Sequence, residues 1–220
     1  MIINKYKVIF IHIPKNAGTS IETYFDKEPH VKGFQIARKH DNIEIIKNNF
    51  PEKYKTYKKF TIIRNPYDRM VSWYFFLKYE LSNMWRNYFD LENEDVFGWR
   101  FLSFKEFLKN PEKVNLEMII KMKQLMARAG ISKNFIDQQI PYHYNGLTRP
   151  QYTWIDETVE IIKFENLNKE LSEFFEKEIN LPIINKSKHE HFLKYYDKDS
   201  LDVVYEKYKK DFKKFNYKRI

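Results

Sequence analysis

The chain has 220 residues, of which 43% are hydrophobic and none is cysteine, and its 39 basic and 30 acidic side chains give a net charge of +9. This length and apolar content fit one globular domain, residues 1–220, and exclude a disordered chain and a disulfide framework. Because no run approaches the ~20 apolar residues of a membrane span and no signal peptide is evident, we expect a cytoplasmic protein.

The first predicted strand, residues 8–13, runs into a turn that starts a helix. Residues 14–18 form this turn, and Thr19 or Ser20 is the expected N-cap of the helix. The start of a helix presents unpaired backbone N–H groups and the positive end of the helix dipole, and Lys15 adds a full positive charge. The sequence therefore predicts an anion site in this turn.

The turn lacks the Walker A pattern GxxxxGK[ST], since Lys15 precedes the glycine, and a standard NTPase is not expected. Its wording, IPKNAGTS, resembles the 5′-phosphosulfate loop of sulfotransferases that use 3′-phosphoadenosine-5′-phosphosulfate (PAPS). The similar branch holds heparan sulfate 2-O-sulfotransferase and the chondroitin-type enzymes, where a threonine stands in place of Asn16. The resemblance implies that the cofactor is bound by Lys15, Asn16, Ala17, Gly18, Thr19 and Ser20.

Sulfuryl transfer to an alcohol requires a base for the hydroxyl proton, and histidine is the usual candidate near neutral pH. Related sequences place a short Lys-His or Gly-His element before a helix, and here Lys39 and His40 precede the predicted helix 41–50. The resemblance thus implies that His40 is the general base, with a helix-cap histidine as the alternative. His12 lies inside the first strand and is predicted as a core residue. Lys15 is expected to stabilise negative charge on the departing phosphate.

A second strand, residues 59–63, also runs into a helix. Asn65 is a good N-cap, Pro66 suits the first helical position, and Asp68 favours the positive end of the helix dipole. If the two strands lie in one parallel sheet, Arg64 lies beside the first turn, at the edge where open α/β sheets bind ligands.

This second segment is similar to the family's RNPxxRxxSxY signature, which is matched by Arg64, Asn65, Pro66, Arg69, Ser72 and Tyr74. The resemblance implies that Arg64 and Ser72 hold the 3′-phosphate of PAPS. A guanidinium suits two phosphate oxygens at once, which agrees with this role. Arg69 is predicted as a structural or surface charge.

The rest of the chain predicts helices and one strand around a polar, aromatic loop. The helices are expected at residues 103–109, 116–129, 166–179 and 199–212, and the strand at 157–164. The last helix is predicted to face the core with Val203, Val204, Tyr208 and Phe212. In the loop, candidate acceptor contacts are His143, Arg149, Gln151 and Tyr152, with turn and packing roles equally open. In relatives the loop at residues 185–189 lies near the cofactor, so Lys186 and Ser187 are candidates for the phosphate end, with a solvated turn as the alternative.

These patterns predict an α/β, three-layer, P-loop-like fold of the sulfotransferase type, with a central parallel sheet flanked by helices. The leading hypothesis is PAPS-dependent transfer of sulfate to a hydroxyl acceptor, for which the resemblance implies a saccharide. The alternatives are a nucleotide kinase-like phosphoryl transferase and a non-catalytic adenosine-phosphate-binding module. We expect no metal, and no nucleic-acid partner because the lysines are dispersed. The oligomeric state is not indicated.

Overall fold

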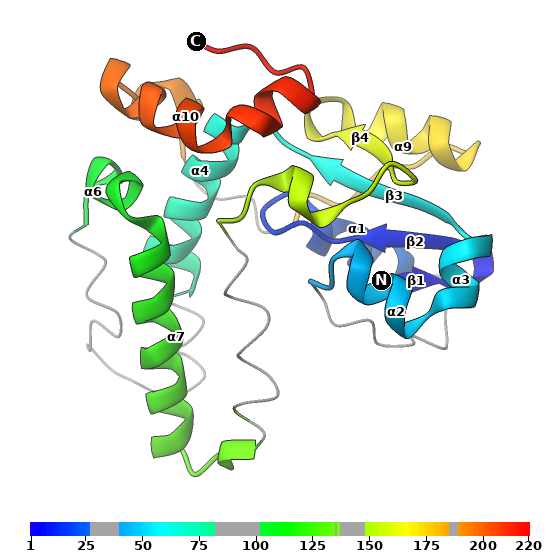
Figure 1. The fold of residues 1–220 in the computed structure, drawn as a ribbon, viewed down its shortest axis with the longest axis horizontal. Helices are drawn as coiled ribbons and strands as arrows, with labels where there is room; N and C mark the ends of the chain where they lie inside the picture. Colours follow the sequence, from blue (N-terminus) through cyan, green and yellow to red (C-terminus); the bar gives the residue numbers. More distant parts are fainter. Residues whose placement is uncertain (27–39, 82–101, 135, 137–147, 185–188) are drawn as a thin grey trace. The chain divides into compact units, whose positions relative to one another are not determined.

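The structure is a computed structural model that describes residues 1–26, 40–81, 102–134, 136, 148–184 and 189–220 (Figure 1). The chain divides into two compact units. Unit 1 consists of Met1–Asn65, Pro150–Lys186 and Lys209–Arg219, and unit 2 of Pro66–Arg149, Ser187–Tyr208 and Ile220. The single domain expected over residues 1–220 stays a prediction.

Unit 1 contains a sheet whose described strands have the order β1-β2-β3-β4 (Figure 1). β1 (Ile2–Ile3) is antiparallel to β2 (Val8–Ile11), whereas β2, β3 (Lys58–Ile63) and β4 (Glu160–Lys163) are parallel. The predicted α/β fold with a largely parallel central sheet is confirmed, and the antiparallel β1 is an addition to it. Since parallel strands end at the same edge, the turns after β2 and β3 are neighbours.

Helices cover both faces of this sheet, because successive side chains of a strand point to opposite sides. On one face, α1 (Gly18–Asp26) and α9 (Leu167–Phe175) pack in a cluster with Val8, Phe10, Phe60 and Ile62. On the other face, α2 (Ile43–Asn49) and the 3-10 turn η4 (Gln151–Trp154) pack with Ile9, Ile11 and Ile63. Burial of one such side chain stabilises the fold by about 1.5–3 kcal/mol.

The remaining elements of unit 1 are short. They are η1 (Asn4–Tyr6), α3 (Pro51–Thr56) and η5 (Phe164–Asn166). The strand predicted at 157–164 is β4 and spans only 160–163, and a 3-10 turn at 164–166 separates it from α9. The helix predicted at 166–179 ends already at Phe175, because the next residue, Glu176, has a left-handed conformation. Asn42 caps α2 by accepting from the backbone N–H of Ile45.

Unit 2 is helical in its described part. It contains α4 (Pro66–Phe75), the π-helix η2 (Phe76–Leu81), α6 (Phe104–Lys109), α7 (Pro111–Arg128), η6 (Phe192–Tyr195) and the start of α10 (Lys198–Lys214). The helices predicted at 103–109 and 116–129 are confirmed, although α7 begins earlier, where Asn110 caps it and Pro111 takes the first position.

The last helix, α10, was predicted over 199–212 and is interrupted by a non-helical residue, Tyr208. Val204, Tyr208 and Phe212 are buried as predicted. The prediction that Val203 also faces the core is wrong, since this side chain is 45% exposed. A helix turns 100° per residue, so the direct neighbour of a buried position commonly lies outside the apolar stripe.

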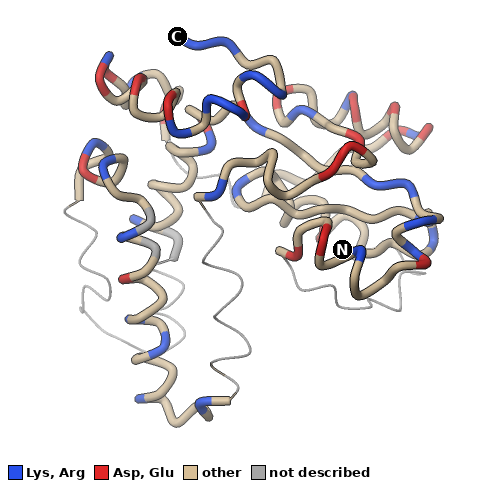
Figure 2. Tube along the Cα trace, in the orientation of Figure 1, with Lys and Arg blue, Asp and Glu red and all other residues tan. Residues whose placement is uncertain are grey.

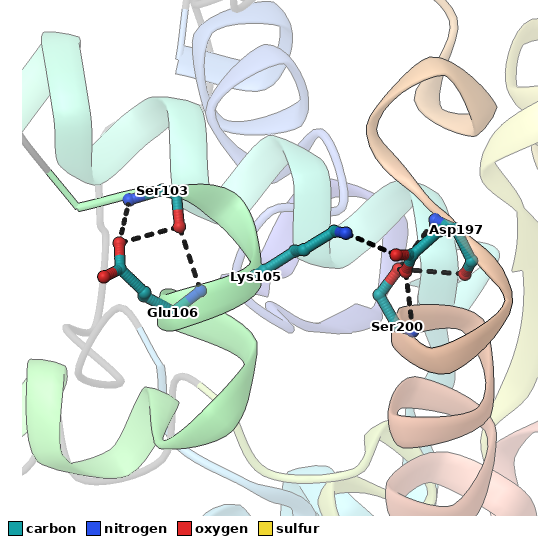
Figure 3. Close-up of polar contacts among 5 residues, drawn as sticks. All are labelled: Ser103, Lys105, Glu106, Asp197 and Ser200. Atoms are coloured by element: carbon teal, nitrogen blue, oxygen red, sulfur yellow. Dashed lines mark hydrogen bonds and ion pairs between the residues drawn. The ribbon is translucent and has the colours of Figure 1, made fainter.

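Two reciprocal caps fix helix starts in unit 2 (Figure 3). Ser103 accepts from the backbone N–H of Glu106, whose carboxylate accepts from the Ser103 N–H. Asp197 and Ser200 exchange the same pair of bonds at the start of α10. Lys105 contacts the Asp197 carboxylate, and this ion pair, followed by the Ser200 bonds, lowers the pKa of Asp197. These caps satisfy backbone donors that a helix start leaves unpaired.

Basic residues are spread over the described elements and form no single basic arm (Figure 2). This distribution is most evident on α10, where lysines and acids share one helix. Among the described helices, none has the length and hydrophobicity that crossing a bilayer requires.

Candidate active site

The first turn of the predicted site has an unusual backbone between β2 and α1. Lys15 and Ala17 have φ angles of 70° and 60°, in the left-handed region that side chains other than glycine rarely adopt. The helix begins at Gly18, and the Ala17 carbonyl accepts from the N–H of Ser20. The prediction that Thr19 or Ser20 is the N-cap is therefore wrong, because both lie within the first helical turn.

Left-handed residues in a tight turn bring backbone N–H groups together into a concave, anion-binding surface. At this turn the nine-residue helix α1 adds the positive end of its dipole. Such conformations cost of order 1–3 kcal/mol each and persist at sites that the surrounding structure over-determines. The local geometry thus suits the phosphate-sized anion that the sequence predicts.

Gly18 packs directly against the imidazole of His12. A Cβ atom added at Gly18 would lie 1.9 Å from His12 Nε2 and 2.1 Å from its Cδ2. The His12 ring is held by Glu22, whose carboxylate accepts from Nδ1 at 2.8 Å. His12 is 4% exposed, as predicted for a core residue, and it supports the floor of the turn.

Gly18→Ala is expected to lower the free energy of unfolding by about 1–3 kcal/mol, the usual cost of overpacking. The reason is the contact with His12, which has to leave its place against Glu22. Chemical denaturation measures the effect. The double variant with His12→Ala is the control: in that background the added methyl group is expected to cost much less, and an undiminished cost would contradict the role assigned to the ring.

His40 lies beside His12 in unit 1. Its Nδ1 donates to the backbone carbonyl of His12 at 3.1 Å, and the two ring centroids are 4.4 Å apart. A carbonyl oxygen only accepts, so the proton of the neutral His40 ring is on Nδ1 and Nε2 is the basic nitrogen. This tautomer is the one that a general base acting through Nε2 requires.

Arg64 follows β3 and joins the second turn to the first. Its Nη1 donates to the backbone carbonyl of Lys15 at 3.0 Å, and its guanidinium carbon lies 4.2 Å from the centroid of the Phe164 ring. The two strand-to-helix turns are therefore adjacent, as the sequence predicted. Arg64 is 9% exposed, which leaves its charge in a poorly hydrated position that favours an anionic neighbour.

The backbone of the second turn, which follows β3, binds the carboxylate of Glu165. The N–H of Asn65 donates to Glu165 Oε1 at 2.9 Å, and the hydroxyl of Tyr217 donates to Glu165 Oε2 at 2.9 Å. Burial, followed by the charge of Glu165, raises the pKa of Tyr217. Tyr217 consequently remains protonated and serves as a donor throughout the physiological pH range.

The other residues of the second signature lie on α4, in unit 2. Ser72 is 3% exposed and Arg69 is 3% exposed. Nη1 of Arg69 donates to the backbone carbonyl of Arg149 at 3.0 Å, which agrees with the structural role predicted for it. The role of Ser72 toward a phosphate stays a prediction, and Lys186, Ser187 and His143 lie outside the described residues.

Sequence reasoning missed the buried polar network beneath the two turns. Asn16, predicted as a cofactor contact, is 1% exposed and donates to protein oxygens, and Gln151, named as an acceptor candidate, is 0% exposed. Asp211 of α10 is 0% exposed and accepts from the backbone of the segment after Pro150. The one local signal for this network in the sequence was Asp211, an acidic residue beside the apolar stripe of the last helix.

The residues of unit 1 suit a ligand that has an anionic group at each of its two ends. A concave turn with Lys15 and a buried arginine after the next strand lie next to each other, and Gly18 lets the start of α1 pack directly against His12. Among the described residues, no group of three His, Asp or Glu side chains has the geometry of a metal site, and the expectation of a metal-free reaction stays a prediction.

Comparison with protein families gives a match to the model described as "Sulfotransferase family" over residues 1–218. The chain belongs to the sulfotransferase family. Comparison with curated proteins and with solved structures finds no match. Membership assigns this sulfotransferase the transfer of a sulfuryl group from a sulfate donor to a hydroxyl acceptor. The heparan sulfate and chondroitin branch stays a prediction.

Proposed function

We propose that this sulfotransferase uses PAPS as its donor, a saccharide hydroxyl as its acceptor and His40 as its general base. The observation that carries the donor assignment is the bond between the Arg64 guanidinium and the Lys15 carbonyl, 3.0 Å long. It brings a second cationic group next to the first anion-binding turn. A donor with a phosphosulfate at one end and a 3′-phosphate at the other matches this pair.

PAPS supplies an activated sulfuryl group when it is bound, so the chain has to bind, orient and move a proton. The turn at residues 15–18 holds the phosphosulfate end through backbone N–H groups and the start of α1. Lys15 stabilises the negative charge that grows on the departing oxygen. Arg64 holds the 3′-phosphate, a role that the likeness to the family's second signature also gives to Ser72.

His40 removes the acceptor proton as the hydroxyl oxygen attacks sulfur. The bond from Nδ1 to the His12 carbonyl supports this role, because it fixes the ring and leaves the basic lone pair on Nε2. The His12 ring packs against His40 and is itself held by Glu22. The saccharide acceptor rests on the likeness of both motifs to the carbohydrate branch.

Nucleotide binding tests the donor assignment. We expect 3′,5′-diphosphoadenosine, the desulfated donor, to stabilise the protein in a thermal shift experiment by about 2.7 kcal/mol at one hundred times its Kd. ATP and AMP, which lack the 3′-phosphate, are expected to give much smaller shifts. A larger shift with ATP and Mg²⁺ than with diphosphoadenosine would contradict the proposal and favour a phosphoryl transferase.

Acceptor chemistry requires a separate experiment. Transfer of labelled sulfate from PAPS is measured over a panel of glycans, with simple alcohols and tyrosine peptides as the comparison set. Label on saccharides and not on the comparison set is the expected result. Label on peptide tyrosine alone would overturn the saccharide assignment while leaving the donor assignment intact.

A further inference from the structure

We propose that Gln151 is the positioning residue that fixes the spacing between the two anion-binding turns, and that Asn16 acts with it as one unit. The inference rests on the proposed function, because the spacing matters only if one ligand uses both turns. It concerns three segments of unit 1: the first turn, the residue after β3 and the start of η4. The side chains of Asn16, Arg64 and Gln151 in these segments are all buried.

Gln151 takes the place of a neighbouring strand at the end of β3. The backbone N–H of Arg64 donates to Gln151 Oε1 at 2.9 Å, and Gln151 Nε2 donates to the backbone carbonyl of Arg64 at 2.8 Å. Because an N–H only donates and a carbonyl only accepts, these two bonds fix the orientation of the amide. One side chain thus holds both polar backbone groups of Arg64.

Asn16 connects the first turn to the same amide. Its Nδ2 donates to Gln151 Oε1 at 2.7 Å and to the backbone carbonyl of Ile62 at 2.7 Å. Both acceptors lack a hydrogen, so the orientation of the Asn16 amide is also determined. A threonine hydroxyl at this position has one proton and can make only one of the two bonds.

The two φ-positive residues of the turn, Lys15 and Ala17, flank Asn16 on either side. The Asn16 amide therefore anchors the turn at its centre, directly against the end of β3. Lys15 in turn meets the Arg64 guanidinium through its carbonyl. The two turns are therefore connected in two ways. The amides of Asn16 and Gln151 connect the first turn to the backbone of Arg64, and the Arg64 guanidinium connects to the backbone of Lys15.

A buried carboxylate keeps Gln151 itself in place. Asp211 Oδ2 accepts from the N–H of Gln151 at 2.7 Å, and Asp211 Oδ1 accepts from the N–H of Tyr152 at 2.9 Å. Asp211 and Gln151 are both 0% exposed. Both carboxyl oxygens of Asp211 thus accept from consecutive backbone N–H groups, so the start of η4 is held at two points.

Asn16 also carries an unusual feature for a packing residue. Its Oδ1 is buried and has no hydrogen-bond partner among the described residues. Buried polar atoms without a partner are rare, and each needs an explanation. The Asn16 amide thus has an unsatisfied oxygen, while its nitrogen donates two hydrogen bonds. This is the expected result if the two donated bonds are needed to fix the position of the turn.

A misplacement of about 1 Å can reduce catalysis about 100-fold when reacting groups must be aligned. Loss of either amide is therefore expected to affect binding of a ligand that spans both turns more than it affects folding. This difference separates a positioning role from a general packing role.

The test is a double-variant cycle with Asn16→Ala and Gln151→Ala, read by calorimetric binding of 3′,5′-diphosphoadenosine and by chemical denaturation. Each single variant is expected to raise the Kd by about tenfold or more, and the double variant by little more than either single variant, because the residues act together. Asn16→Thr, which keeps one donor, is expected to give an intermediate Kd.

Tyr54→Phe is the matched control. It also removes a side-chain hydrogen bond in unit 1, from the Tyr54 hydroxyl to Asp156 at 2.7 Å, and none of the hydrogen bonds described for Tyr54 reaches either turn. We expect it to leave the Kd unchanged. A Kd that rises in the control as much as in Asn16→Ala, or additive effects of the two amide variants, would overturn the positioning role.

The binding experiment separates the positioning role of the two amides from the assignment of PAPS as the donor. If the unmodified chain binds diphosphoadenosine and the amide variants bind it equally well, the positioning role is wrong and the donor assignment stands. If the unmodified chain does not bind it, the donor assignment is wrong and the positioning role with it.

Discussion

Lys15→Ala is expected to reduce the rate of sulfate transfer at saturating donor by about 10²- to 10³-fold, the usual effect of removing one group that stabilises developing charge. The reason is that the ammonium acts mainly on the charge that appears as the sulfur–oxygen bond breaks. The Kd for 3′,5′-diphosphoadenosine is expected to change much less, because backbone N–H groups and α1 hold the phosphate as well. Steady-state transfer of labelled sulfate and calorimetry measure the two quantities.

Lys55→Ala is the control for this variant. Lys55 lies on α3 in the same unit and pairs only with exposed Glu52, 3.1 Å away, among the contacts described for it. Its removal is expected to leave both quantities unchanged. A Lys15→Ala protein that binds diphosphoadenosine far more weakly yet transfers sulfate at a normal rate when saturated would contradict the role in the transition state.

His40→Ala is expected to reduce transfer by about 10²- to 10⁴-fold, the range attributed to one general base. Binding of diphosphoadenosine is expected to be unchanged, since His40 contacts the His12 carbonyl and is not one of the residues proposed to bind phosphate. Single-turnover transfer measures the rate. Added imidazole is expected to restore part of the activity, because it can occupy the space of the missing ring.

His191→Ala provides the comparison for His40. His191 is an exposed histidine of unit 2 that packs on Phe192, and its removal should leave transfer unaffected. Equal transfer by the His40 variant and the unmodified protein would exclude His40 as the base. Absence of transfer from both proteins, together with diphosphoadenosine binding, would favour a non-catalytic binding module.

The two turns could be predicted because their signals are local in sequence. An apolar run followed by a turn marks β2, and Asn65 and Pro66 mark the start of α4 at the residues where the structure has it. The start of α1 was placed too late, because the pattern offered two hydroxyl residues as caps. The left-handed conformation of Ala17, which ends the turn earlier, has no signature in a residue that rarely adopts it.

The network beneath the turns could not be predicted, because its members are far apart and each is polar in an unremarkable context. Gln151 lies in a segment rich in proline and aromatic residues, and its partner Arg64 is 87 positions earlier. Asp211 is 60 positions later, within a helix whose other acids are exposed or half-buried. No periodicity links such residues, and only the path of the chain brings them together.

This long-range network has a consequence for the order in which the protein matures. Asn16 bonds to Gln151 across 135 positions, and Gln151 is held by Asp211, a further 60 positions along the chain. A ribosome releases the amino-terminal strands first, so β2 and β3 can pair while the support for their turns is still unsynthesised. Ligand capture should therefore begin only after Asp211 has been synthesised, and a nascent chain halted before Asp211 should gain no protection from the nucleotide.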